Sequence, residues 1–139
     1  MIRYVDNISA EEYLNLRQQV DWVLFPLEEA QECIDNSYMV ICVRDEEQAI
    51  GVARLIWDGG YIAMLSDVIV APEYQGQGIG RKLVEACIQN LKDSIKPGYK
   101  VKLNLNAAKD KELFYEKFGF RQRPNKEAGA GMDQWFIKE

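Results

Sequence analysis

The sequence predicts one α/β domain with a mixed, mostly antiparallel central sheet flanked by helices. Two observations lead to this fold class. Short apolar segments with the period-two pattern of strands are interspersed with segments of helical period. Their order is helices first, then a run of antiparallel strands, then strands alternating with helices. A chain of 139 residues suits one domain, so we expect residues 1–139 to fold together.

The N-terminal part predicts a short strand followed by two helices. Ile2–Val5 is a short apolar segment suited to a first strand. Ser9 and Glu12 have the spacing of a capping box, which begins a helix carrying Tyr13. Pro26 then interrupts the chain, and Leu27–Asn36 has the pattern of a second short helix.

Three strands should follow in antiparallel order. Tyr38–Val43 and Ala49–Trp57 are apolar runs separated by a charged turn over Arg44–Gln48. Asp58-Gly59-Gly60 is a hairpin signal, after which Tyr61–Val70 continues as the fourth strand of the sheet.

The remaining sequence alternates between helical and strand periods. Apolar residues recur at helical spacing from Ile79 to about Asn90, and Val101–Leu105 alternates like a half-buried strand. We expect a short helix over Lys109–Phe118 and a last strand over Met132–Ile137. In that helix, Leu113, Phe114 and Phe118 should point inward, with Gly119 at the C-terminal cap.

The composition excludes several function classes. The chain contains no histidine, so it cannot build a Ser-His-Asp triad, a Cys-His dyad or an imidazole-ligated metal site. Cys33, Cys42 and Cys87 fit neither a disulfide framework nor a zinc pattern, so we expect no metal. The net charge of −5 disfavours nucleic acid as a partner. We expect no membrane partner and a cytoplasmic location, because no apolar run could span a bilayer and the N-terminus lacks a signal-peptide layout.

The segment from Ser66 to Lys82 carries the clearest chemical signal. An apolar strand ends at Pro72, passes through a turn with glycine at positions 76, 78 and 80, and enters an amphipathic helix. Such glycines let backbone N–H groups approach a ligand, and the N-terminus of a helix favours an anion. Arg81 and Lys82 would oppose the helix dipole unless an anion were bound. The sequence therefore predicts a phosphate or pyrophosphate site.

The pattern of this loop distinguishes between the known phosphate-binding motifs. It lacks the Gly-Lys-Ser/Thr ending of a Walker loop and the spacing of the dinucleotide fingerprint. It resembles the signature of the GCN5-related N-acetyltransferases, Gln/Arg-x-x-Gly-x-Gly/Ala, whose three defining positions are Gln75, Gly78 and Gly80. The segment from Leu113 to Phe120 resembles a later motif of the same family, and the resemblance covers roughly residues 38–122.

The resemblance implies acetyl-CoA as co-substrate. It implies a sheet splayed from a bulge in the fourth strand, where pantetheine would pair with Val68, Ile69 and Val70. An amide in that stretch, that of Val70, would polarise the thioester carbonyl. Main-chain amides of the loop would hold the pyrophosphate, and its residues are Gln75, Gly76, Gln77, Gly78, Ile79, Gly80 and Arg81.

The resemblance also assigns one catalytic residue. Tyr115 matches the tyrosine that protonates the departing thiolate, and a phenol keeps its proton at neutral pH. A buried core tyrosine is the alternative interpretation. One departure from the family pattern is Ala108, where relatives that acetylate protein N-termini often have asparagine. Asn106 lies nearby and is a weaker candidate for a cofactor contact.

The acceptor side of the reaction has several candidates and no clear code. Asp67, Glu28 and Glu29 are candidate general bases, and a chain of water molecules is an equal alternative. The acceptor could contact aromatic and polar residues that would otherwise belong to the core, namely Trp22, Leu24, Phe25, Arg54 and Trp135.

The sequence therefore predicts an acetyl-CoA-dependent N-acetyltransferase that moves acetyl directly to a primary amine, with a small amine as the expected acceptor. Lysine or N-terminal protein acetylation is an alternative, as is a non-catalytic module that binds or senses acyl-CoA. An acetyltransferase toxin acting on charged tRNA fits poorly with the acidic composition. A homodimer through the terminal strands is a further possibility that the resemblance implies.

Overall fold

The computed structural model describes residues 1–139 and divides into two units, Met1–Leu105 and Asn106–Glu139. The first unit holds a five-stranded sheet in the order β1-β2-β3-β4-β5. Neighbouring strands run antiparallel from β1 to β4, whereas β5 runs parallel to β4. The mixed, mostly antiparallel sheet is as predicted. The strands are β1 (Ile2–Val5), β2 (Met39–Asp45), β3 (Gln48–Trp57), β4 (Ile62–Val70) and β5 (Lys102–Asn104).

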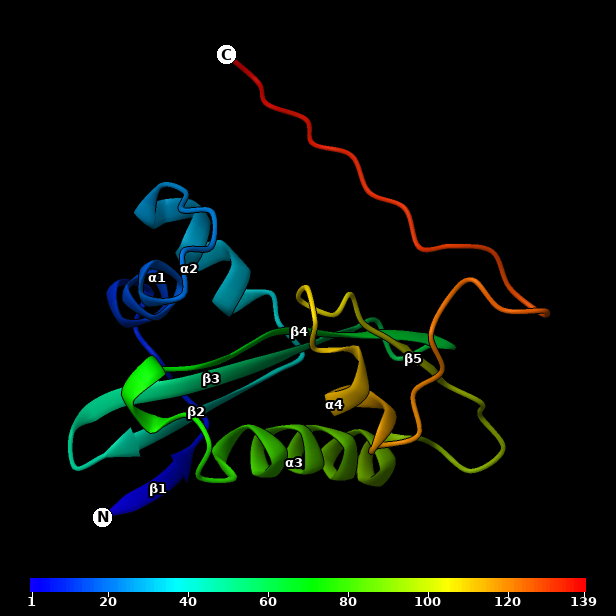
Figure 1. Cartoon of the computed structure of the whole chain (residues 1–139), viewed down its shortest axis with the longest axis horizontal. Helices are drawn as coiled ribbons and strands as arrows, with labels where there is room; N and C mark the ends of the chain where they lie inside the picture. The colour runs from blue at the N-terminus through cyan, green and yellow to red at the C-terminus, as the bar shows by residue number, and fades with distance from the viewer. The chain divides into compact units, whose positions relative to one another are not determined.

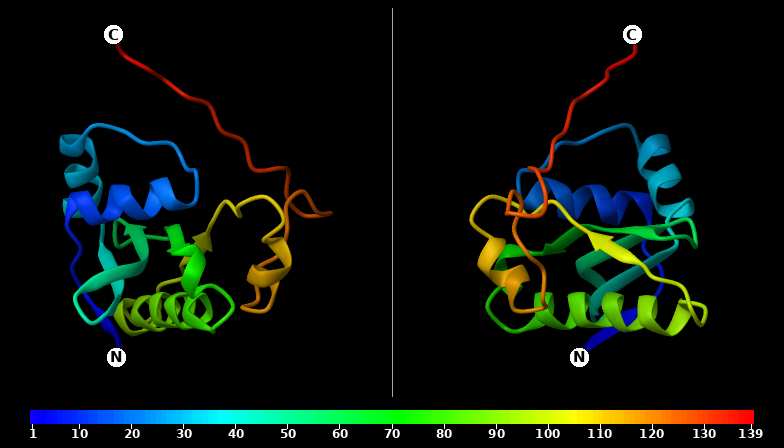
Figure 2. Two further views of the ribbon diagram at one scale, coloured as in Figure 1. Left: turned by 60° about the vertical axis from the view of Figure 1, so that its left-hand side comes forward. Right: turned by 90° about the vertical axis from the view of Figure 1, so that its right-hand side faces the viewer.

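Helices cover both faces of this sheet (Figures 1 and 2). On one face α1 (Ala10–Gln19) packs on β3 and β4, and α2 (Leu27–Asp35) packs against α1. On the other face α3 (Ile79–Ser94) crosses β2, β3 and β4. A short 3₁₀ turn, η1 (Pro72–Tyr74), connects β4 to the loop before α3.

The start of α1 is fixed by the predicted capping box. The Ser9 side chain accepts from the Glu12 amide at 3.1 Å, and Glu12 accepts from the Ser9 amide at 3.0 Å. The guanidinium of Arg44 also binds Glu12 and lowers the pKa of this carboxyl to about 2. Glu12 thus remains charged at neutral pH and joins α1 to β2.

The core of the first unit consists of apolar side chains from the sheet and from the inner faces of α1 and α3. Leu16 comes from α1, Leu55 and Leu65 come from the sheet, and Leu83 and Val84 come from α3. Cys42 and Cys87 are buried free thiols whose pKa values burial raises to about 11 and about 12, as expected of small core residues. No helix is long and apolar enough to cross a membrane.

Some predicted boundaries were wrong. The charged turn shortens to two residues because β2 extends to Asp45 and β3 begins at Gln48. The helix from Ile79 continues to Ser94, one turn beyond Asn90.

In the second unit, the predicted helix over Lys109–Phe118 shrinks to α4 (Glu112–Glu116), since Asp110 adopts a left-handed φ of 69° that a helix cannot contain. Leu113 is 70% exposed, so its predicted inward orientation was wrong.

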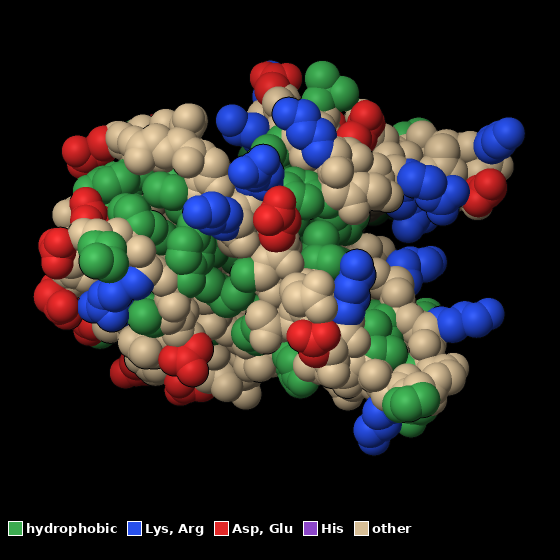
Figure 3. Space-filling view, turned by 90° about the horizontal axis from the view of Figure 1, so that it is seen from below, with side chains coloured by type: hydrophobic (Ala, Val, Ile, Leu, Met, Phe, Trp, Pro, Cys, Tyr) green, Lys and Arg blue, Asp and Glu red, His purple; other side chains and the backbone are tan.

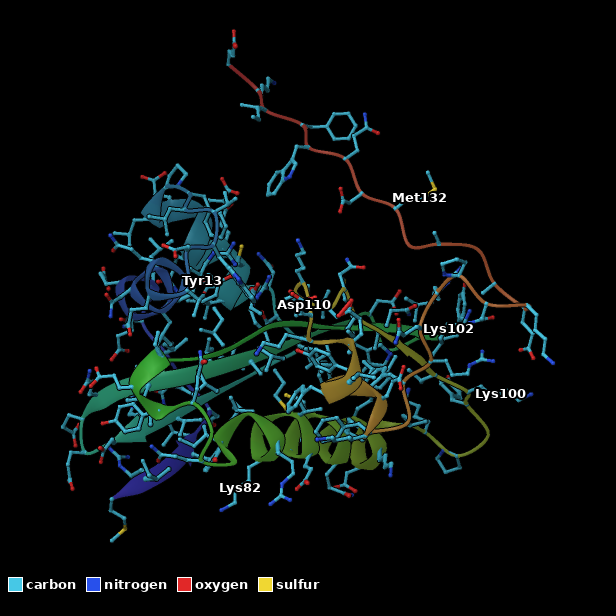
Figure 4. All side chains as sticks on the ribbon, viewed as in Figure 1. Tyr13, Lys82, Lys100, Lys102, Asp110 and Met132 are labelled. Atoms are coloured by element: carbon cyan, nitrogen blue, oxygen red, sulfur yellow. The ribbon has the colours of Figure 1, made fainter.

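The predicted last strand, Met132–Ile137, was also wrong. This segment has no regular secondary structure, and no backbone hydrogen bond joins it to a strand. Its large apolar side chains are exposed, including Met132 at 93% and Trp135 at 71% (Figure 4). A segment with residues suited to a strand forms one only where a partner edge pairs with its backbone.

β4 contains the predicted bulge. Its register against β3 shifts between the pairs Val52–Ile69 and Arg54–Ser66, so β4 has one extra residue there. Asp67 lies within this bulge with a φ of 54°, a left-handed conformation that aspartate tolerates better than most residues. Its side chain binds side chains from the neighbouring elements around the bulge.

The Asp67 carboxylate accepts hydrogen bonds from three buried side chains. The Tyr13 hydroxyl donates at 2.5 Å, Arg17 Nη1 donates at 2.9 Å and Arg54 Nε donates at 2.6 Å. The side chains of Arg17, Arg54 and Asp67 are only 10–11% exposed. Burial, followed by the charge of Asp67, raises the pKa of Tyr13, so that its hydroxyl remains a donor. Figure 4 marks Tyr13 on α1. We call this group the Asp67 cluster.

Replacing Asp67 with asparagine should strongly destabilise the protein. Asparagine also tolerates a left-handed backbone, so Asp67→Asn mainly removes the charge and leaves two buried guanidiniums without a counter-ion. We expect the free energy of unfolding in urea to fall by about 3 kcal/mol or more. Glu12→Gln is the matched control because Glu12 is 31% exposed and should lose about 1 kcal/mol. Equal losses in the two variants would contradict this account of the cluster.

Candidate functional site

The predicted glycine loop connects β4 to α3 and is anchored at its β4 end. The Gln75 side chain donates to the Val70 carbonyl at 2.9 Å, and the Tyr74 hydroxyl donates to Asp45 at 2.7 Å. Gly76 and Gly78 have φ values of 83° and 84°, and Gly78 is the N-cap of α3. Only glycine adopts such angles without strain. A Cβ atom at either position would meet nothing within 4 Å, so the space beside the loop is open.

Six consecutive amides in this loop have no acceptor within the protein. The N–H groups of residues 76–81 make no hydrogen bond, and the first bond at this end of α3 joins the Lys82 amide to the Gly78 carbonyl at 3.2 Å. No side chain caps the helix, and no acidic residue lies in its first turn. The N-terminus of a 16-residue helix with unpaired donors attracts anions.

Basic side chains lie next to these amides. Arg81 and Lys82 are exposed in the first turn of α3, and Arg81 has only a loose contact with Glu85, at 3.7 Å. Figure 4 marks Lys82 pointing away from the sheet, and Figure 3 shows lysine and arginine side chains interspersed with acidic ones on the surface of the molecule. The loop therefore has the donors and the positive charge that phosphate oxygens require.

The edge of β4 that faces β5 is partly unpaired. β5 pairs with β4 only from Ile62 to Met64, whereas β3 pairs with β4 as far as Val70. The stretch Leu65–Val70 therefore has backbone groups without a strand partner on one side. This stretch includes the bulge and residues 68–70, and it runs directly into η1 and the glycine loop. An extended ligand could add to this edge as a further strand.

Tyr115 lies on α4 in the second unit. Its ring packs against Phe114 and Phe120 at centroid distances of 5.0 and 6.1 Å. Burial raises the pKa of its phenol to about 12. The hydroxyl makes no hydrogen bond within the protein and is not sealed from solvent. The phenol of Tyr115 thus keeps its proton at neutral pH, and its hydroxyl is free. Its catalytic role stays a prediction.

The candidate general bases differ in their hydrogen-bond partners and in their exposure. Both carboxylate oxygens of Asp67 are already bonded to three donors, so this residue is poorly placed to accept a proton from an amine. Glu28 and Glu29 are exposed in the first turn of α2, where they complement the helix dipole. Neither has a contact that would activate it, and a base supplied by water remains open.

The candidate acceptor contacts fall into two groups. Arg54 belongs to the Asp67 cluster, and the rings of Trp22 and Phe25 lie over the Arg17 guanidinium at 5.5 and 4.7 Å. Leu24 is 50% exposed beside them in the chain. By contrast, Trp135 is exposed in the second unit. Asn106, the weaker candidate for a cofactor contact, also belongs to the second unit. Its side-chain oxygen lies near Gly131, 3.7 Å from the place that a Cβ atom on this glycine would take.

Tyr13 and Arg17 are site residues that were not predicted from the sequence. A signal for them existed, because Tyr13, Leu16 and Arg17 occupy the i, i+3 and i+4 positions of one helix face. An arginine within an apolar stripe needs a buried partner. That partner, Asp67, is 50 residues away in the sequence, so no local pattern identifies it. No group of side chains suited to a metal ion occurs in the structure.

Comparisons with known proteins agree with the fold. A sequence profile of the acetyltransferase (GNAT) domain matches residues 35–122, and thus spans both units. A protein of Pyropia yezoensis named "uncharacterized N-acetyltransferase ycf52" is 31% identical over 123 residues, which cover 86% of this chain and 68% of that protein.

Two solved structures are similar along almost the whole chain. One is a probable acetyltransferase from Staphylococcus aureus, with a TM-score of 0.86 and 25% identity, covering 97% of this chain and all of that one. The other is a GNAT-family acetyltransferase from Streptococcus pneumoniae, with a TM-score of 0.77 and 26% identity, covering 100% and 98%. With the glycine loop, the bulged β4 and the mixed sheet, these matches show that the chain is an acetyltransferase of the GNAT family.

Proposed function

We propose that this enzyme transfers an acetyl group from acetyl-CoA to a primary amine, with a small molecule as the acceptor. The observation that carries the proposal is the run of six unpaired amides at residues 76–81, near an unpaired stretch of β4. Two anionic phosphates and an extended, amide-containing arm are the features of coenzyme A that suit such a loop and such a strand edge. Family members use acetyl-CoA as co-substrate, in agreement with this fit.

The loop and the strand have separate tasks in this proposal. The amides of the loop and the side chain of Arg81 bind the pyrophosphate. The backbone of Val68, Ile69 and Val70 pairs with the pantetheine arm, which aligns the thioester along β4. The amide of Val70 donates to the thioester oxygen and stabilises the negative charge that develops there.

The chemistry requires one bond to form and one to break. Acetyl-CoA supplies the acetyl group as a thioester, and the neutral amine nitrogen attacks its carbonyl carbon while the carbon–sulfur bond breaks. Tyr115 gives its phenolic proton to the departing sulfur. A proton leaves the amine nitrogen to water, and the tyrosine then regains its proton from solvent. The products are the N-acetylated amine and free coenzyme A.

The other expectations remain predictions. A single domain over residues 1–139, a cytoplasmic location and a homodimer are further proposals, and protein acetylation and a purely acyl-CoA-binding role are the alternatives to the proposed function. A non-catalytic binder would have no need of a leaving-group acid, so the behaviour of Tyr115 separates binding from catalysis.

Gly78→Glu should abolish tight binding of acetyl-CoA. The substitution strains a φ of 84° and places a carboxylate where the phosphates would lie. Calorimetric titration should show affinity weakened about tenfold or more. Gly98→Glu is the matched control, since Gly98 has a φ of 86° and equally open surroundings in a turn outside the site. Loss of affinity in both variants, or in neither, would refute the loop assignment.

Tyr115→Phe should lower kcat about 100-fold or more while leaving the affinity for acetyl-CoA nearly unchanged. Release of coenzyme A, followed with a thiol-reactive dye, measures this effect, and Tyr99→Phe at an exposed position serves as control. Burial raises the pKa of Tyr115 from the ordinary value of a phenol to about 12, so the phenol keeps its proton at higher pH than a free tyrosine. We therefore expect that kcat does not fall between pH 8 and about pH 10. A wild-type rate in Tyr115→Phe would exclude the catalytic role.

A further inference from the structure

The Asp67 cluster holds one positive charge more than it neutralises. It contains two guanidiniums and one carboxylate, all about nine-tenths buried. The Tyr13 hydroxyl is neutral, because its raised pKa keeps the proton in place. A net charge in a buried position is unfavourable unless a counter-ion or an ordered polar group offsets it. Carbonyl and hydroxyl groups bind part of the two guanidiniums, and a further negative group would neutralise the remaining charge of the cluster.

The hydrogen bonds of the two arginines show where such a group could bind. Arg17 donates from Nε to the Val23 carbonyl and from Nη1 to Asp67. Arg54 donates from Nε to Asp67, and from Nη1 to the Cys33 carbonyl and the Ser37 hydroxyl. The Nη2 atom of each arginine has no acceptor in the protein, yet neither is among the polar atoms sealed from solvent. Each guanidinium therefore has one free donor edge.

The aromatic rings around Arg17 limit what can approach it. The centroids of Tyr13, Trp22 and Phe25 lie 5.8, 5.5 and 4.7 Å from its guanidinium carbon. These rings lie around the guanidinium and restrict the approach of a ligand to the donor groups that they leave free. In-plane, paired hydrogen bonds are the geometry in which a guanidinium binds a carboxylate. A single carboxylate would also match the single excess charge.

The cluster lies next to the proposed reaction centre. Asp67 precedes Val70 by three residues, which corresponds to about 10 Å of extended strand. A ligand anchored at the arginines would thus need only a few atoms to place an amine beside the thioester. The anions of the co-substrate already have their own place at the glycine loop. The group that the arginines bind must therefore belong to the acceptor.

The net negative charge of the first unit favours the ammonium group at the other end of such an acceptor. The first unit has sixteen acidic and ten basic side chains over Met1–Leu105. This excess of carboxylates attracts ammonium groups from solution. The arginine pair is a local exception that would select amines bearing a carboxylate over plain amines.

We propose that the acceptor is a small amine that also carries a carboxylate, and that Arg17 and Arg54 bind this carboxylate through their Nη2 groups. This proposal rests on the proposed function, since it names the substrate class of the same reaction. It makes the two arginines specificity-determining residues, and it assigns to the aromatic residues Trp22 and Phe25 the task of orienting Arg17.

The test compares amines that differ only in the carboxylate, such as phenylalanine with phenethylamine and γ-aminobutyrate with propylamine. We expect kcat/KM of the wild-type enzyme to be about 10- to 100-fold higher for the carboxylated partner, the discrimination that charge-assisted hydrogen bonds give. Arg17→Lys and Arg54→Lys keep the charge but lose the planar donor pair. In each variant we expect the ratio of the two kcat/KM values, carboxylated amine over plain amine, to fall towards one. Arg44→Lys is the control, because Arg44 binds Glu12 outside the cluster and should retain the wild-type preference.

Two results would overturn the proposal. One is efficient acetylation of plain amines with no gain from a carboxylate, which would leave the acetyltransferase function intact. The other is a preference that survives in both arginine variants. Failure of the proposed function would look different, because calorimetry would then detect no acetyl-CoA binding and no amine would be acetylated.

Discussion

The interaction on which the rest of the structure depends is the carboxylate of Asp67 with its three donors. It joins α1, through Tyr13 and Arg17, to β3, through Arg54, at the point where β4 bulges. Arg54 also donates to the Cys33 carbonyl in the last turn of α2, where a positive charge complements the helix dipole. One carboxylate therefore holds two helices and two strands in place. It also compensates for the left-handed backbone that Asp67 adopts.

The bulge and the short β5 together create the surface that the chemistry needs. β5 pairs with only three residues of β4, so the later part of β4 has a free edge that leads to the glycine loop. Unpaired backbone groups are unfavourable in a folded protein unless water or a ligand binds them. The loop amides at residues 76–81 and the free edge of β4 are two sets of such groups, separated by the paired amides of Ala71, Tyr74 and Gln75. Ligand binding thus completes the hydrogen bonding that the fold leaves open.

Local patterns predicted the parts of this architecture that depend on local physics. The capping box at Ser9, the apolar strands and the glycine loop each depend on residues that are close in sequence, and the structure contains all three. The bulge in β4 came from the family resemblance. The unsuccessful predictions concerned long-range contacts or single backbone angles.

Three examples show the difference. The Asp67 cluster joins residues that are 13 to 54 positions apart, which no periodicity reveals. The segment over Met132–Ile137 has strand-like residues but no partner for its backbone. The helix around Tyr115 is short because Asp110 adopts a left-handed angle, although its sequence is compatible with a longer helix.

The central claim is that backbone amides of the loop and of β4 bind the co-substrate. The most direct measurement is a titration of isotopically labelled protein with coenzyme A, in which the NMR signal of each backbone amide is followed. The account predicts the largest shifts for the amides of residues 76–81, together with clear shifts for residues 68–70. Saturable binding that left both groups of amides unchanged, while amides elsewhere moved, would contradict it.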